Sequence, residues 1–337
     1  MNLDKLVAEV SADSPAGEDL EYDPAFGELE RAALGSSEHV MGDEVVEAEP
    51  PEWREVKNQA EALFDRTKDL RVAVLLTRAE LNINGLVGFA NGLSLTRQLL
   101  ENYWDSVYPL LDEEDDNDPT FRVNTIINLA DDEGLLKDLL NTSIVSATMA
   151  GRFSLRDVRI ANGEMQAPAG QDDVADTSII NAAFMEADLD ELIATAAQAT
   201  EAMEHAQAID AVFNDKVGAA NGPDLQPLFD DLKDLKGIFA ENLVARGVGV
   251  EVDEESATGG GEGGQAISGD IRSREDAIRM LDKICIYFER NEPSSPVPLL
   301  LNRAKRLISK DFLEILRDLT PDGVLQAESI GGVTADE

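Results

Sequence analysis

Cysteine is nearly absent from this chain, since Cys285 is the only one in 337 residues. A single cysteine excludes an intramolecular disulfide and is consistent with a reducing cytosol. Histidine is almost as scarce, with His39 in an acidic stretch and His205 in an alanine-rich one. A zinc site needs several convergent ligands at a characteristic spacing, and the sequence contains no such spacing. We therefore expect no metal ion, no cofactor and a cytoplasmic location.

Positive charge is scarce as well. The chain holds 28 lysines and arginines against 68 aspartates and glutamates, a formal net charge of −40. A surface this acidic is repelled by nucleic acid phosphates and by anionic lipid head groups, so we expect no nucleic acid partner. Two interpretations of the charge stay open. It is either a docking surface for basic proteins or a solvated surface that keeps the chain soluble.

Long hydrophobic runs are also missing. The opening stretch MNLDKLVAEVSADSPAGED has no apolar segment of the kind that a signal peptide needs. The most apolar short run, Val72–Leu76, is soon followed by Arg78 and Glu80. A membrane-spanning helix needs about 20 predominantly apolar residues, so we expect no insertion into a membrane.

Catalytic motifs are absent too. The acidic run Asp112–Asp118 lacks the glycine and the distal glutamate of a calcium-binding EF-hand loop. The glycine-rich stretch 259–264 lacks the lysine of a phosphate-binding loop and is flanked by glutamates. Cys285 shares an apolar helical face with Leu281 and Phe288, which favours a core position over a nucleophile. We expect no enzyme. A hydrolase using two of the many carboxylates is the enzymatic alternative.

The residues that are present favour helices. Aromatic residues make up only 5% of the chain, and Ala, Leu, Asp and Glu dominate it. Glycines and prolines make the first fifty residues look irregular, and apolar residues at helical spacing begin at Trp53. Helices are predicted from 53, over Leu70–Ala79, from about Gly85 through Trp104, over 121–130, over 177–214 and over 224–246. A small hairpin is predicted between 144 and 161.

The sharpest boundary is the glycine-rich stretch at 249–268, whose composition is typical of a flexible tether. Beyond it, two amphipathic helices are predicted. Residues 269–337 contain 10 basic and 13 acidic residues, so this segment carries −3 and residues 1–268 carry −37. Two helices bury only a thin core, and their apolar stripes are too broad for one mutual contact. Packing against copies of the same chain would cover them.

These observations predict a mainly α protein with four parts. An N-terminal helical bundle spans 1–160, and a middle helical hairpin spans 175–248. A flexible glycine-rich linker covers 249–268. A small C-terminal helical oligomerisation module occupies 269–337.

The N-terminal part resembles a known family. The run Ser14–Pro24, with Phe26, Leu29 and Glu30 after it, is similar to the opening motif of the ImpA-type N-terminal domain. The likeness continues through Thr67–Arg71, Leu76–Ala79 and Leu99–Trp104 and closes with Arg122 and Asn124. The C-terminal stretch Glu292–Ala304, with Phe312 and Leu316–Leu319, is similar to the end of TssA proteins of bacterial type VI secretion. Both ends therefore resemble the TssA family.

This resemblance implies a structural role. TssA proteins assemble into rings through their C-terminal region and help to build the baseplate, tail tube and contractile sheath. Because this chain has no long extra domain between its two ends, we favour the baseplate-associated kind. The implied partners are further copies of itself in a six- or twelve-fold ring and the baseplate, tube and sheath proteins. A monomeric acidic adaptor or chaperone for basic proteins is the alternative.

Two sets of residues follow as candidates. The expected oligomer interface contains Pro296, Pro298, Leu300, Arg303, Ala304, Phe312, Ile315 and Leu316. The N-terminal motif, with a role in folding or in partner binding, contains Gly17, Glu18, Asp19, Tyr22, Asp23, Pro24, Lys68, Asp69 and Arg71. We expect Tyr22 and Phe26 to pin the entry loop onto the bundle, and the carboxylates of Glu18, Asp19 or Asp23 to hold Lys68 and Arg71.

Overall fold

The computed structural model describes residues 1–35, 39–41, 44–46, 50–167 and 174–248, and five single residues beyond them. Those five are Leu281, Val297, Leu300, Leu301 and Lys305. The chain divides into two compact units, Met1–Val252 and Asp253–Glu337. The fold below is that of the first unit.

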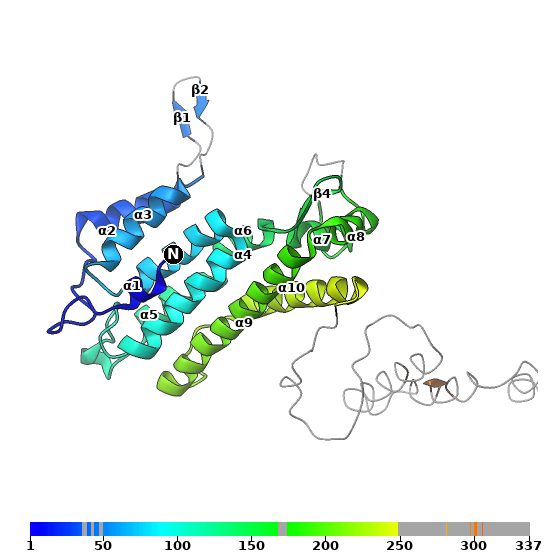
Figure 1. The fold of residues 1–337 in the computed structure, drawn as a ribbon. Helices are drawn as coiled ribbons and strands as arrows, with labels where there is room; N and C mark the ends of the chain where they lie inside the picture. Colours follow the sequence, from blue (N-terminus) through cyan, green and yellow to red (C-terminus); the bar gives the residue numbers. More distant parts are fainter. Residues whose placement is uncertain are drawn as a thin grey trace, which may run out of the picture. The chain divides into compact units, whose positions relative to one another are not determined.

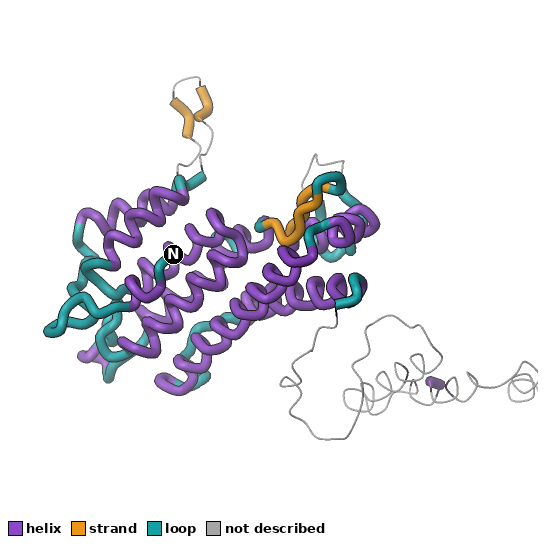
Figure 2. The backbone as a smooth tube through the Cα atoms, in the orientation of Figure 1, coloured by secondary structure: helices purple, strands orange, loops and turns teal. Residues whose placement is uncertain are grey.

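Helices make up most of the first unit (Figures 1 and 2), which confirms the mainly α prediction. They are α1 (Leu3–Val7), α2 (Pro24–Leu34), α3 (Trp53–Phe64), α4 (Leu70–Tyr103), α5 (Thr120–Ile127), α6 (Leu135–Asn141), α7 (Leu155–Ala161), α8 (Thr177–Glu186), α9 (Leu189–Val217) and α10 (Gln226–Ala245), with short 3-10 turns η1 (Glu113–Asp115) and η2 (Asn128–Ala130). The antiparallel strands β1 (His39–Met41) and β2 (Glu44–Val46) form one hairpin, and β3 (Ser143–Ala147) and β4 (Gly151–Ser154) form another.

Helix α4 supplies the centre of the core, and it is a hairpin of two helical halves. Gly85 has φ 64° and ψ −146°, which breaks the helix. A Cβ atom at Gly88 would lie 2.1 Å from the Glu80 carbonyl oxygen, and one at Gly92 would lie 2.6 Å from Thr77 Oγ1. Residues eight and fifteen apart cannot touch along one straight helix, so the halves fold back on each other. Glycine allows this close approach.

By length and composition, α4 is the one helix among the described residues that could cross a membrane. Its most apolar window is 61% buried inside the fold, as in the core helix of a globular domain. Because the chain reverses at Gly85, each half of α4 is shorter than the 34 residues of the whole element.

The other helices pack around this hairpin. Helix α3 packs on α4, and α2 packs on α3. On the other side α9 packs along α4, and α10 packs on α9. The rings of Trp104 and Phe213 meet edge to face with centroids 5.4 Å apart. Residues of the predicted regions 1–160 and 175–248 thus share one core.

Several elements differ from those that the sequence pattern predicts. The first fifty residues contain α1 and α2, where irregular chain was expected. The single helix expected over 177–214 is two, because Asp188 caps a new helix by accepting hydrogen bonds from the amides of Asp190 and Glu191. The hairpin within 144–161 is confirmed, but α7 follows it directly, starting at a capping box formed by Ser154 and Asp157.

The predicted tether 249–268 lies outside the described residues. So does most of the predicted C-terminal module, including Cys285. Of its residues, Leu281, Val297, Leu300, Leu301 and Lys305 are described, and all five are helical.

The contact between α4 and α9 gives the first testable prediction. Trp104 and Phe213 are both buried, so Trp104→Ala and Phe213→Ala should each lower the free energy of unfolding by about 3–4 kcal/mol. The double variant should lose about 1 kcal/mol less than the sum, because the two rings touch. Urea unfolding measures all three, with the exposed Met149→Ala as the control. Fully additive losses would contradict the shared core.

Candidate functional site

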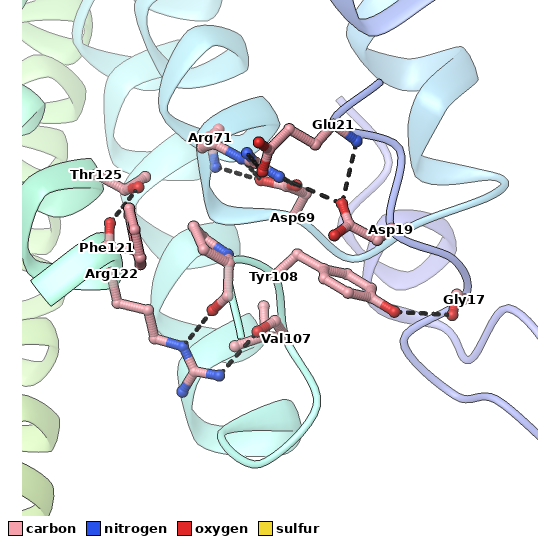
Figure 3. A network of polar contacts seen from close by, with 11 residues as sticks. Gly17, Asp19, Glu21, Asp69, Arg71, Val107, Tyr108, Phe121, Arg122 and Thr125 are labelled. Atoms are coloured by element: carbon pink, nitrogen blue, oxygen red, sulfur yellow. Dashed lines mark hydrogen bonds and ion pairs between the residues drawn. The ribbon is translucent and has the colours of Figure 1, made fainter. Parts of the chain in front are cut away.

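Three loops that are far apart in the sequence meet beside the start of α4 (Figure 3). The amide of Glu18 donates to the Arg66 carbonyl oxygen at 3.1 Å, and the amide of Lys68 donates to the Ala16 oxygen at 2.7 Å. On the other side, the amide of Leu70 donates to the Tyr108 oxygen at 2.8 Å. We call this arrangement of residues 14–18, 66–70 and 107–109 the three-loop junction.

Gly17 is the tightest point of the junction. Its φ of 78° is in the left-handed region, and a Cβ atom there would lie 2.0 Å from the Arg66 carbonyl oxygen. No other residue type fits both the backbone angle and the space. Gly17 therefore shapes the entry loop through a backbone angle and a close contact that only glycine allows.

Arg71 is the charged centre of the site. Its guanidinium nitrogen Nη2 lies 2.7 Å from Asp69 Oδ2, and Nη1 lies 2.9 Å from Glu21 Oε2. Asp19 is further away at 3.6 Å, and the guanidinium stacks over the Phe26 ring at 4.7 Å. Burial alone would lower the pKa of Arg71, but the hydrogen bonds to Asp69 and Glu21 raise it above its ordinary value.

Lys68 has a different environment from the one expected. Its side chain is buried, and Nζ donates to the Phe64 carbonyl oxygen at 2.9 Å. No carboxylate among the described residues forms an ion pair with it. Burial lowers its pKa to about 8, although Asp65 acts in the opposite direction. The expectation that Glu18, Asp19 or Asp23 holds Lys68 is wrong.

Asp23 instead pairs with Arg66, whose Nη2 lies 2.6 Å from Asp23 Oδ2. Asp23 also accepts a hydrogen bond from the amide of Ala25 and so caps α2, which begins at Pro24. Both hydrogen bonds lower the pKa of Asp23, and the bond from Arg66 has the larger effect. Tyr22 is 94% exposed, so it does not pin the loop as expected, whereas Phe26 is buried.

Arg122 holds the third loop in place. Its side chain is fully buried and donates to the carbonyl oxygens of Trp104, Val107 and Pro109 at 2.5–2.8 Å. Burial lowers the pKa of Arg122 to about 10. These three bonds fix the loop that brings Tyr108 to the junction (Figure 3).

A groove of about 800 Å³ opens beside the junction. Its wall and rim contain three large apolar side chains that are exposed: Leu34 at 81%, Phe121 at 62% and Leu110 at 48%. The other lining residues are Asp19, Glu21, Glu30, Ala33, Arg71, Val74, Leu75, Arg78, Pro109, Asn124, Thr125, Asn128, Asp131, Gly134 and Leu135. Exposed apolar surface gathered in a groove is typical of a binding site.

The structure therefore brings the N-terminal motif and the groove together through Asp19, Glu21 and Arg71. Sequence reasoning did not identify Leu34, Leu110 and Phe121, because single apolar residues at helix ends and in loops carry no pattern. Arg78 was also missed. Its Nε lies 2.6 Å from Asp138 Oδ2, and its guanidinium lies 5.0 Å from the centroid of the Trp53 ring.

The other candidates from the sequence are the possible metal ligands, the histidines and the expected oligomer interface. Within the described residues, no three His, Cys, Asp or Glu side chains gather in a way that could hold a metal ion. His205 lies 3.5 Å from Arg97 on α4, and burial lowers its pKa. Of the expected oligomer interface, Leu300 alone is described, and it is exposed. Pro296, Pro298, Arg303, Ala304, Phe312, Ile315 and Leu316 lie outside the described residues.

Comparison with known proteins gives three results. The family described as "ImpA, N-terminal, type VI secretion system" matches residues 7–131. The type VI secretion system component TssA1 of Pseudomonas aeruginosa is 44% identical over 343 residues, covering 98% of each chain. A solved N-terminal domain of the TssA component from Burkholderia cenocepacia, which includes the ImpA_N region, aligns with a TM-score of 0.58 and 23% identity. That match covers 74% of this chain and 95% of the other and supports the fold.

Gly17 provides a test of the junction. We expect Gly17→Ala to lower the free energy of unfolding by roughly 3 kcal/mol, through backbone strain and the collision with the Arg66 carbonyl. Gly27→Ala is the matched control, because Gly27 lies within helix α2 and a Cβ there meets only the flexible end of Arg31. The control should be neutral or up to about 1 kcal/mol more stable. Equal effects in chemical denaturation would disprove the assigned role of Gly17.

Lys68 provides a pH test. Its pKa is about 8 in the folded chain and 10.5 as the ordinary value, so between these pH values the unfolded chain binds more protons. The Lys68 contribution to stability must therefore rise with pH across that window. Lys68→Met, which keeps the stem and removes the charge, should abolish this rise. At pH 7.5 we expect Lys68→Met to have a higher free energy of unfolding than the parent chain. This difference should shrink by up to about 3 kcal/mol as the pH rises to 10.5. A difference in unfolding free energy that stays the same at every pH would contradict a buried Lys68 amine without an ion pair.

Proposed function

The chain belongs to the TssA family of type VI secretion components, and from this premise we propose that it is a non-enzymatic structural subunit of that apparatus. In this proposal, copies of the chain form a ring that helps to assemble the baseplate, tail tube and contractile sheath. The ring is cytoplasmic and associated with the secretion apparatus.

The observation that carries this proposal is the alignment with the Pseudomonas protein, which is 44% identical across 98% of both chains. Similarity of this extent covers the N-terminal motif and the C-terminal segment together. The alignment leaves almost no part of either chain uncovered. Within the proposal, we favour a baseplate-associated role over one at the far end of the sheath.

Charge supports the assignment of self-association to residues 269–337. Residues 1–268 carry a net −37, so copies of that part repel one another at short range. Residues 269–337 carry only −3 and contain the predicted apolar stripes. Symmetric assembly through this segment buries apolar surface without bringing the acidic parts into contact.

The first unit then serves as the part that each subunit presents to the apparatus. Its groove and junction are formed within one chain, from α2, α4, α5, η2, the start of α6 and the loops between them. No second copy is needed to complete them. This independence supports a division between a ring-forming segment and a partner-binding unit.

Native mass tests the ring. We expect the native mass of the full chain to be a whole-number multiple, greater than one, of the 36.5 kDa subunit mass. A chain ending at residue 268 should have the mass of one copy. Leu300→Asp and Ile315→Asp place charges in the predicted apolar stripes, where a buried unpaired carboxylate is costly, and should also reduce the copy number.

Met149→Asp is the control, because Met149 is exposed in the first unit and should leave the mass unchanged. The thermal transition of the first unit should survive in every variant. A chain ending at residue 268 that keeps the full copy number would show that the oligomer is held elsewhere.

A further inference from the structure

The groove beside the three-loop junction has a surplus of negative charge. Arg71 is already paired with Asp69 and Glu21, and Arg78 with Asp138. Glu30 and Asp131 also line the groove, and neither has an ion pair within the described residues. Both are exposed. The arginines therefore add no free positive charge, and a ligand meets two unpaired carboxylates.

Apolar side chains supply the rest of the binding surface. Leu34 is at the end of α2, Leu110 is in the loop after the junction, and Phe121 is in the first turn of α5. Val74, Leu75 and Leu135 also line the groove, and Val74 and Leu135 are buried. Burying exposed apolar surface of this kind removes it from water and so favours association.

The secondary structure of the lining limits the shape of the occupant. All lining residues lie on helices, 3-10 turns or loops, and none lies on a strand. An extended peptide could not add itself to a sheet here, so its backbone amides and carbonyls would stay unpaired in an apolar groove. A helix satisfies its own backbone groups and presents a stripe of side chains at i, i+3 or i+4, and i+7.

We propose that this groove binds an amphipathic helix of a partner protein whose apolar stripe is flanked by lysine or arginine. The helix inserts apolar side chains between Leu34, Leu110 and Phe121, and its basic flank pairs with Glu30 and Asp131. This inference rests on the proposed function, because a scaffold must hold other components of the apparatus, and it adds the chemistry of the partner.

Two other occupants fit the groove less well. In a second copy, residues 1–268 carry −37 and would be repelled by the groove, and residues 269–337 are already used by the ring contacts of the proposed assembly. A neutral apolar small molecule would leave Glu30 and Asp131 without an ion pair. A basic helix satisfies both the apolar wall and the charged rim.

A phage-displayed library of short helices, with randomised stripe and flanking positions, tests the proposal on the full chain. We expect enriched helices to have Leu, Ile or Phe on one face and an excess of Lys and Arg beside it. A synthetic peptide of the most enriched sequence should bind Leu34→Ser/Phe121→Ser at least tenfold more weakly. The Met149→Ser/Met185→Ser control, which changes two exposed methionines away from the groove, should bind it normally.

The charge is tested separately with Glu30→Gln/Asp131→Asn, which keeps the shape of both side chains. We expect roughly tenfold weaker binding of the basic peptide and a smaller dependence of its affinity on salt. Each variant is first shown to keep the parent thermal transition, so a loss of binding reports the groove. Phe121→Leu, which keeps an apolar side chain, should restore most of the affinity when combined with native Leu34.

Several results would overturn the proposal: no enriched helix, enrichment of acidic helices, or peptide binding that is unchanged in the Leu34→Ser/Phe121→Ser variant. A native mass that falls in this variant would assign the groove to a second copy and would also overturn it. Failure of the ring proposal looks different. There, removal of residues 269–337 leaves the copy number unchanged, whatever the peptide does.

Discussion

The structure of the first unit depends on one close backbone contact, where Gly17 meets the Arg66 carbonyl. The hydrogen bonds on either side of it join residue 16 to residue 68 and residue 18 to residue 66. Because residues 66–70 also lead into α4, this contact fixes the N-terminal motif against the core hairpin. Arg71 is then placed between Asp69 and Glu21, and Arg122 holds the adjoining loop. The groove is the space that these fixed loops leave beside α2 and α5.

The helices of the core could be predicted from sequence, and the groove could not. Apolar spacing identifies α3 and both halves of α4, and glycine marks the break at Gly85, because these signals are local. Helix α2 is short and follows an irregular run, so the spacing of its apolar residues gives only a weak helical signal. The groove is formed by α2, α4, the loop at Leu110, α5, η2, the loop at Asp131 and the start of α6, so its residues are drawn from distant parts of the sequence. The motif resemblance located Asp19 and Arg71 without indicating the apolar wall beside them.

Charge separates the two roles that we assign to the chain. In this proposal, the acidic first unit resists contact with its own copies and attracts basic partners, since the groove's carboxylates without an ion pair are negative. Residues 269–337 are almost neutral and are the part in which self-association costs least electrostatically. The proposal thus assigns ring formation to residues 269–337 and the binding of other components to the first unit.

The most direct test of this account is native mass spectrometry of the full chain titrated with a basic amphipathic helix selected for binding. The account predicts that the oligomer takes up one peptide per chain and keeps its copy number, because ring contacts and groove lie in different parts of the chain. An oligomer that dissociates as peptide binds, or that saturates well below one peptide per chain, would contradict it.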